Sequence, residues 1–141
     1  MTISQGACSC GTVEIAFTHA RPHAEYSPRA CDCDYCEPRG AQWLSDPQGQ
    51  LEVLSAAAMR EETQGSGQAR FHVCPHCGDL VAVSYDTGEG LLGAVNARVL
   101  KAYEELSEAQ SASPKRLDAQ QKTERWSALW TPTRIRYRST A

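Results

Sequence analysis

Hydrophobic and polar positions alternate with a period of two in the clearest segment of the chain. Val13, Ile15 and Phe17 alternate there with Glu14 and Ala16. This period is typical of a β-strand with one buried face. Short apolar runs that favour further strands occupy residues 51–54, 71–73, 80–85 and 91–95. Glycines and prolines separate these runs. The pattern predicts a mainly β protein.

Helical patterns are scarcer. The composition of residues 117–129 favours a helix, and residues 56–62 form a second helix candidate, for which a strand continuing the preceding one is the alternative. Near the end of the chain, Arg134, Arg136 and Arg138 alternate with Ile135 and Tyr137. This alternation predicts a final strand whose arginines lie on the solvent face.

Length and composition indicate a single domain that needs covalent or metal support. The chain has 141 residues, of which 41% are hydrophobic and only ten are aromatic. We expect one domain over residues 1–141 with a thin core, and such domains commonly gain stability from metals or disulfides.

The charge is uneven along the chain. Residues 1–114 carry 7 Lys/Arg against 15 Asp/Glu, whereas residues 115–141 carry 7 against 2. We expect the basic segment 115–141 to dock on the acidic remainder. A basic segment can also bind nucleic acid or an anionic surface, but it contains no dense cluster of cations and the whole chain has a net charge of −3.

The cysteines are best explained as metal ligands. The sequence starts without a basic region followed by an apolar stretch, and no run is long enough to span a membrane, so we expect a cytoplasmic protein. In that reducing compartment clustered cysteines are more often metal-binding or catalytic than disulfide-bonded. Seven cysteines also cannot all pair within one chain.

Two cysteine pairs predict a closed zinc site. Cys74 and Cys77 form a Cys-x-x-Cys-Gly half-site, in which Gly78 permits the turn that brings the two sulfurs together. A half-site needs a second pair, and Cys8 and Cys10 provide one. Four thiolates make a closed structural zinc site.

The remaining cysteines, Cys31, Cys33 and Cys36, predict a second zinc ion with an open position. Short chelate loops cost little closure entropy, and catalytic zinc sites typically have three protein ligands. The expected content is therefore two Zn²⁺ per chain. The alternatives are a disulfide framework, an iron–sulfur cluster, and closure of the second site by a histidine, for which His72 and His76 are the candidates.

The order of these motifs resembles the glutathione-dependent formaldehyde-activating (Gfa-like) family, which includes centromere-protein-V-like members. Cys-x-Cys-Gly and a strand come first, then Cys-x-Cys-x-x-Cys, then Phe-x-x-Cys-x-x-Cys-Gly and a strand. Gly40-Ala41 and the Ala-Val-Asn-Ala-Arg segment at 94–98 add to the resemblance, which covers about residues 6–106. It implies the mainly β Mss4-like fold.

The resemblance also implies roles for both cysteine clusters. Structural zinc would be held by Cys8, Cys10, Cys74 and Cys77. The catalytic zinc would be held by Cys31, Cys33 and Cys36. The implied reaction is carbon–sulfur lyase chemistry, in which a small thiol such as glutathione joins formaldehyde or the adduct is split. The alternative is a non-catalytic zinc module that binds a protein or nucleic acid.

Three carboxylates in or beside the cysteine triplet bear on the substrate. Asp32 and Asp34 lie within it, and Glu37 follows it. If they face the open position, their charges disfavour an anionic thiol such as glutathione and favour a neutral or cationic one. If they point outward as turn residues, they exert no such selection.

Overall fold

The computed structural model describes residues 1–113 and 116–138, and within them the chain forms an 11-stranded sheet and one α-helix. The strands are β1 (Thr2–Ala7), β2 (Val13–His19), β3 (Arg29–Cys31), β4 (Gln42–Leu44), β5 (Gln50–Ser55), β6 (Arg60–Glu62), β7 (Arg70–Val73), β8 (Leu80–Asp86), β9 (Leu91–Asn96), β10 (Gln110–Ala112) and β11 (Thr131–Tyr137). The helix is α1 (Ala119–Leu129), and 3₁₀ turns lie at His23–Glu25, Ala97–Val99 and Tyr103–Glu105. Of the predicted segment 115–141, residues 115 and 139–141 lie outside the described part.

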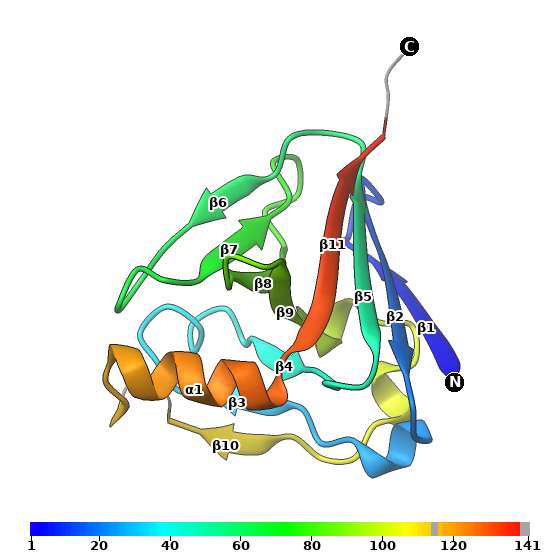
Figure 1. Ribbon diagram of the computed structural model, residues 1–141. Coiled ribbons are helices and arrows are strands. Elements are labelled where there is room, and N and C mark those ends of the chain that lie inside the picture. The colour runs from blue at the N-terminus through cyan, green and yellow to red at the C-terminus, as the bar shows by residue number, and fades with distance from the viewer. Residues whose placement is uncertain (114–115, 139–141) are drawn as a thin grey trace.

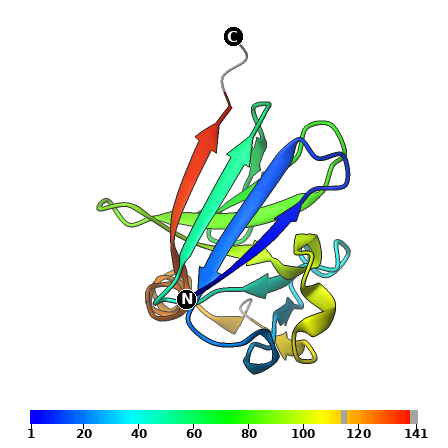
Figure 2. The same ribbon diagram turned by 90° about the vertical axis from the view of Figure 1, so that its right-hand side faces the viewer.

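The sheet branches at β9. One path runs β1-β2-β5-β11-β9-β4-β3-β10, and β8, β7 and β6 extend from the other edge of β9. The first half of β9 pairs with β11 and its second half with β4, while β8 pairs along most of its length. Figures 1 and 2 show the long β1-β2-β5-β11 arm standing beside the β6-β7-β8 arm. The cross-strand pairs are antiparallel except β5–β11 and β3–β10.

The expectation of a mainly β fold with few short helices is confirmed. Strands β2, β5, β7, β8 and β9 cover the five apolar runs, and β11 is the final strand. The predicted helix at 117–129 is α1, whose N-terminus is closed by a capping box: Asp118 accepts from the Gln121 N–H, and Gln121 accepts from the Asp118 N–H. No helix among the described residues is long and apolar enough to cross a membrane.

The helix predicted at 56–62 is wrong. Residues 60–62 form strand β6, which pairs in register with β7. Met59 is buried just before the strand, and the Tyr35 hydroxyl donates to Glu62 Oε1 over 2.6 Å. Tertiary pairing with β7 therefore overrides a local composition that favours a helix.

Two buried apolar clusters form the core. The first lies between the β1-β2-β5 arm and β8–β9 and includes Cys8 and Cys74 among its members. The second lies around β4, β7, β8 and β9 and includes Cys31, Cys33 and Cys36. Each apolar cluster therefore contains thiols from one of the two cysteine groups.

The arginines of β11 lie on the solvent face, as predicted. Arg134 and Arg136 of β11, and Arg138 directly after it, are all exposed. Arg136 pairs with Glu52 on β5, and Arg138 pairs with Glu14 on β2. These two ion pairs link the end of the chain to acidic residues on β5 and β2.

Residues 45 and 46, directly after β4, anchor the junction of α1 and β11. The Ser45 hydroxyl donates to the Leu129 carbonyl over 2.7 Å, and the Asp46 N–H donates to Thr131 Oγ1 over 2.8 Å. The Asp46 carboxylate in turn accepts from the Tyr26 hydroxyl at 2.6 Å and from two backbone N–H groups. This buried network fixes where α1 lies relative to the sheet.

We predict that Asp46→Asn lowers the free energy of unfolding by about 1–3 kcal/mol at neutral pH, since a buried charged acceptor loses its charge. Burial by itself raises the pKa of Asp46, but the hydrogen bonds from Tyr26 and the backbone outweigh it and lower the pKa. A carboxyl with a lowered pKa stabilises the fold above its unfolded pKa of about 3.9 and loses that contribution as pH falls below it.

Urea unfolding of both proteins at about pH 6 and about pH 3.5 measures this effect. The difference between wild type and Asp46→Asn should shrink at the lower pH, while Asp86→Asn, at the exposed end of β8, should change little at either. A difference that is unaffected by pH would contradict the assigned role of the charge.

Candidate metal centres and ligand pocket

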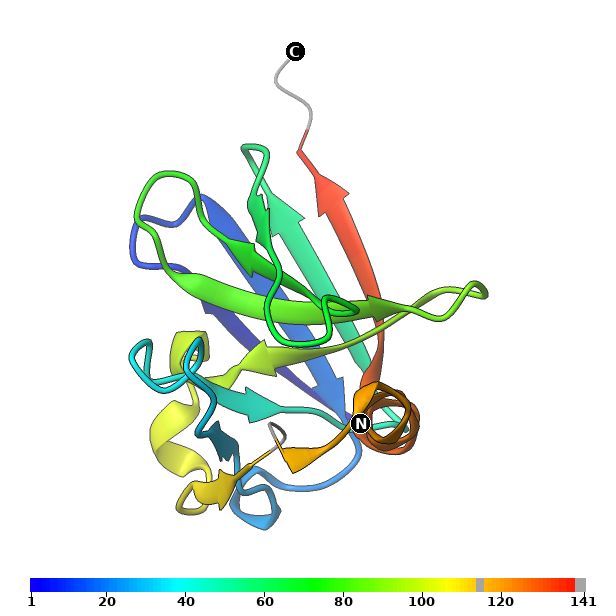
Figure 3. The ribbon, with the colours of Figure 1, turned by 90° about the vertical axis from the view of Figure 1, so that its left-hand side faces the viewer.

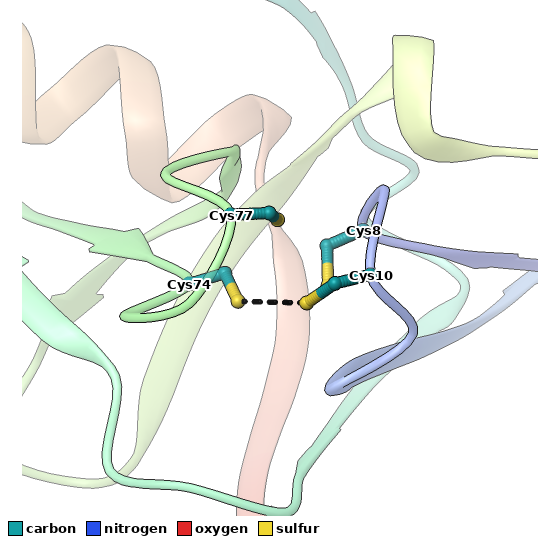
Figure 4. Close-up of side chains that lie close together, drawn as sticks. All are labelled: Cys8, Cys10, Cys74 and Cys77. Atoms are coloured by element: carbon teal, nitrogen blue, oxygen red, sulfur yellow. Dashed lines mark hydrogen bonds between the residues drawn. The ribbon is translucent and has the colours of Figure 1, made fainter.

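The four predicted structural cysteines come together from two turns. Cys8 and Cys10 lie in the β1–β2 turn, and Cys74 and Cys77 lie in the β7–β8 turn. Their side chains point toward one another across the gap between the two loops (Figure 4). Both turns end on a glycine with positive φ, Gly11 at 81° and Gly78 at 78°, which a residue with a side chain rarely adopts.

The arrangement of the four sulfurs fits a tetrahedral zinc ion. All four Sγ atoms lie within 4.8 Å of one another. Cys10 Sγ is 3.7 Å from Cys8 Sγ and 3.6 Å from Cys74 Sγ. With zinc–sulfur bonds of about 2.3 Å, a tetrahedron has sulfur–sulfur edges of about 3.8 Å. The separations are far longer than a disulfide bond, and all seven cysteines are free thiols.

Neighbouring groups already favour thiolates in this cluster. Hydrogen bonding with Thr12 lowers the pKa of the Cys10 thiol to about 6. The Val13 N–H donates to Cys8 Sγ over 3.3 Å. Burial raises the pKa of Cys77 to about 11, so complete ionisation of this cluster calls for a cation.

The three other cysteines meet at the end of β3. Cys31 is the last residue of that short strand, and Cys33 and Cys36 follow in the turn, all three being buried. Strand β3 is held between β4 and β10 (Figure 3). The Cys36 N–H donates to Cys33 Sγ over 3.3 Å, and Tyr35 packs on Phe71 with ring centroids 4.5 Å apart.

The three thiols are poised to bind a cation. Their Sγ atoms lie within 4.8 Å of one another. The hydrogen bond from Cys36 lowers the pKa of Cys31 to about 6, and that bond together with burial raises the pKa of Cys36. A first thiolate is therefore available near neutral pH, while further ionisation requires a positive charge such as Zn²⁺.

No histidine or carboxylate of the described residues completes this second group. His72 is buried elsewhere and lies 2.7 Å from Ser84 Oγ through its Nε2. His76 is exposed and lies 3.1 Å from Thr12 Oγ1 beside the four-thiol cluster. Neither histidine candidate is in a position to act as the fourth ligand.

The three thiols open into a cavity of about 200 Å³. Its apolar walls come from β4, β7, β8 and the C-terminal helix, and the loop 64–66 lies at its side. The lining residues are Arg29, Cys31, Cys33, Cys36, Trp43, Gln64, Gly65, Ser66, Ala69, Phe71, Val83, Ala112, Lys122, Arg125, Trp126 and Trp130. None of the four-thiol cysteines is among them, so the two cysteine clusters differ in their access to a ligand.

Cations line the cavity, and no carboxylate of the described residues does. Arg29, Lys122 and Arg125 line it. The Arg29 guanidinium donates through Nη2 to Ser45 Oγ over 2.8 Å. Burial and the nearby charge of Arg125 lower the pKa of Arg29 to about 10, so the guanidinium remains charged at neutral pH.

The three acidic residues of the triplet region do not line the cavity. Asp34 and Glu37 are exposed. Asp32 Oδ2 accepts from the hydroxyl of Ser113, the residue after β10, over 2.5 Å. Asp34 and Glu37 thus match the interpretation as outward-pointing turn residues, whereas Asp32 is half-buried and its charge acts on the adjacent Cys31 thiol.

Sequence reasoning found the thiols but missed the opposite wall of the cavity. Lys122, Trp126 and Trp130 are spaced by four residues, which places them on one face of α1 and its end. This spacing was a usable signal. Arg29 and Trp43 gave no such signal, because β3 and β4 have only three residues each and are too short to show a periodic pattern.

Comparisons with known proteins accord with this architecture. The family model described as glutathione-dependent formaldehyde-activating enzyme matches residues 3–115. The crystal structure of a Rhodobacter sphaeroides protein from a structural genomics programme is similar, with 25% identity and a TM-score of 0.58, over 77% of this chain and 99% of that one. No curated protein matches the chain significantly. Because the family model covers most of the chain, including all seven cysteines, the chain belongs to the glutathione-dependent formaldehyde-activating enzyme family.

Proposed function

We propose that this protein is a zinc-dependent enzyme of the carbon–sulfur lyase type, which joins a small thiol to an aldehyde or splits the resulting adduct. In this proposal Cys8, Cys10, Cys74 and Cys77 hold a structural zinc ion. The catalytic zinc ion is held by Cys31, Cys33 and Cys36.

The observation that carries the proposal is the different surroundings of the two thiol clusters. The four-thiol cluster has a complete ligand set for zinc and lies outside the cavity. The three-thiol cluster lacks a fourth protein ligand among the described residues and forms part of the cavity wall. Three ligands beside a cavity are typical of catalytic zinc, and four ligands are typical of structural zinc.

The reaction is balanced without a further reactant. The sulfur of the thiol forms a bond to the aldehyde carbon, the carbonyl π bond breaks, and the thiol proton moves to the oxygen, which gives a hydroxyalkyl thioether. The reverse reaction breaks the same carbon–sulfur bond. Zinc held by three thiolates would supply deprotonation of the incoming thiol, while its weakened Lewis acidity favours this addition over a demanding hydrolysis.

The residues of the chain would contribute position and a dry surrounding. Trp43 and Phe71, with ring centroids 6.1 Å apart, form one apolar wall next to the thiols. Exclusion of water strengthens electrostatic interactions at the reacting atoms. The hydrogen bond from the Cys36 N–H to Cys33 Sγ holds the turn in shape, and Tyr35 fixes the turn against β6 and β7.

The alternative of a nucleic-acid-binding module has less support. Two of the three arginines on the face of β11 already pair with Glu14 and Glu52. Lys122 and Arg125 line the cavity. The basic C-terminal segment therefore leaves few cations free for a phosphate backbone, which nucleic-acid binding would require.

We predict two zinc ions per chain after purification without chelators and repletion with zinc. The reason is the division of the seven thiols into groups of four and three. Elemental analysis combined with quantitation of the protein tests this number. A single zinc ion that persists after repletion would contradict the two-site proposal.

We predict that Cys74→Ser and Cys33→Ser have different effects. Cys74 is fully buried and belongs to the cluster that joins two distant turns. Its loss removes structural zinc, whose apparent binding free energy is about 10–16 kcal/mol in small zinc peptides, so soluble folded protein should fall sharply. Cys33→Ser should retain the fold and lose one zinc ion, because its partners are local in sequence. Circular dichroism and metal analysis measure both effects, and equal loss of folded protein would contradict the split.

We predict that Cys33→Ser loses the enzymatic acceleration of thiol–aldehyde exchange. Exchange NMR of formaldehyde with 2-mercaptoethanol measures the rate of adduct formation and cleavage. The wild-type protein should accelerate both directions, and Cys33→Ser should leave only the uncatalysed rate. Ser127→Ala, on the exposed side of α1, is the folded control and should retain activity. Equal rates with wild type and Cys33→Ser would overturn the proposed function.

A further inference from the structure

One wall of the cavity comes from a part of the chain beyond the match to the family model. That match ends at residue 115. Lys122 and Arg125 on α1, with Trp126 and Trp130, line the side of the cavity formed by the later segment. The residues that decide which ligand group binds at this wall are therefore not covered by the family match.

The cations of the cavity lack negatively charged partners within the described ranges. Neither Arg29 nor Lys122 nor Arg125 has a carboxylate within 4.0 Å in residues 1–113 and 116–138. Arg29 is fixed in place through Ser45, which in turn donates to the last turn of α1. Lys122 Nζ lies against the loop at Gly65, 3.0 Å from the position that a Cβ atom on this glycine would take. Positive charges that are held close together without a neutralising partner favour the binding of an anion.

The negative charge of three zinc-bound thiolates does not neutralise the three cationic side chains of the cavity. Three thiolates and one Zn²⁺ together carry a single negative charge. Three cations around them leave a net positive charge of two, and none of the described residues that line the cavity is a carboxylate. A ligand with a negatively charged group would reduce this excess.

The rest of the cavity is apolar and small. Trp126 and Trp130 stack with centroids 4.7 Å apart and an interplanar angle of 14°. Trp43 and Phe71 form the facing wall. The volume of about 200 Å³ is below the range of about 300–1,000 Å³ that is usual for drug-sized ligands. The walls thus fit a flat apolar body smaller than a tripeptide.

We propose that the substrate bound by this site is a small apolar carboxylate, with its carboxylate group held among Arg29, Lys122 and Arg125. Its apolar body lies against Trp126 and Trp130, and its thiol or aldehyde group faces the three cysteines. The reaction at that group rests on the proposed function. The recognition of the carboxylate does not depend on turnover.

Binding of an unreactive probe tests the recognition by itself. The chain has three tryptophans, and all of them line the cavity, so their fluorescence reports on its occupancy. Phenylacetate and its neutral counterpart phenylacetamide have the same shape and differ in charge. Titrated into the zinc-loaded protein at low salt, phenylacetate should bind about tenfold more tightly or better, a difference equivalent to about 1.4 kcal/mol. The ratio should fall at high salt.

Matched variants assign the effect to the cations. The double variant Lys122→Gln and Arg125→Gln should lose about tenfold of its affinity for phenylacetate and keep its affinity for phenylacetamide. Arg134→Gln, an exposed charge on β11 outside the cavity, should bind both probes as wild type does. Equal affinity of wild type for the two probes, or no change in the double variant, would overturn the proposed carboxylate site.

Turnover separates this inference from the proposed function. With formaldehyde, the value of kcat/KM should be higher for 3-mercaptopropionate than for 2-mercaptoethanol, and the double variant should remove that preference. Tight binding of phenylacetate without any turnover would refute the enzymatic proposal and leave the anion site standing. Turnover without preference for the anionic thiol would refute the substrate class and leave the enzymatic proposal standing.

Discussion

The meeting of four thiols from the β1–β2 and β7–β8 turns is the constraint on which the rest of the structure depends. These turns lie at the ends of two arms of the sheet that do not pair directly with each other. Cys10 and Cys74 are 64 residues apart, so their association closes a long loop, and a cross-link between such positions restricts the unfolded chain strongly. Strand β8 begins just after Cys77 and pairs with β9. Strand β9 also pairs with β4, and β4 pairs with β3, at whose end the three other cysteines lie. The position of the three-thiol group thus follows, strand by strand, from the four-thiol group.

The two groups of thiols differ in their surroundings. Four sulfurs come together at the edge of the first apolar cluster, and their number and spacing suit a closed tetrahedral metal site. The triplet, by contrast, lies on one side of a cavity whose other sides carry indole and phenyl rings, three cations and the loop 64–66. The difference lies in what the strands bring to each cluster. A second hairpin reaches the first cluster, whereas a helix that carries no cysteine covers the second.

The parts of this structure that the sequence predicts are those whose signal is local. Strands β2, β5, β8 and β9 have alternating or apolar runs, and each cysteine group is contained in short motifs. The edge strand β1 was missed because its residues are mostly polar and Ile3 is 63% exposed, so that its pairing with β2 alone defines it. Residues 60–62 were assigned to a helix for a related reason, since charged residues on a paired edge strand show no apolar alternation. The pocket could not be predicted from any window, because Arg29, Phe71 and Trp126 meet only through the branching of the sheet.

The charge asymmetry of the sequence acquires a different meaning in three dimensions. Taken as a stretch of sequence, residues 115–141 form one basic segment with a single electrostatic role. The fold divides them in two. Arg136 of β11 and Arg138, directly after this strand, lie exposed and pair with carboxylates of β5 and β2. Lys122 and Arg125 of α1 line the cavity instead, with Arg125 also exposed to solvent, and no carboxylate is among the described lining residues. Since exposed ion pairs contribute little to stability, and the hydrogen bonds of Ser45 and Asp46 already fix the junction of α1 and β11, the two helix cations are not needed to hold the segment in place. Their place in the cavity lining, beside three thiols and without a carboxylate among the described lining residues, is therefore what the proposed anion site rests on.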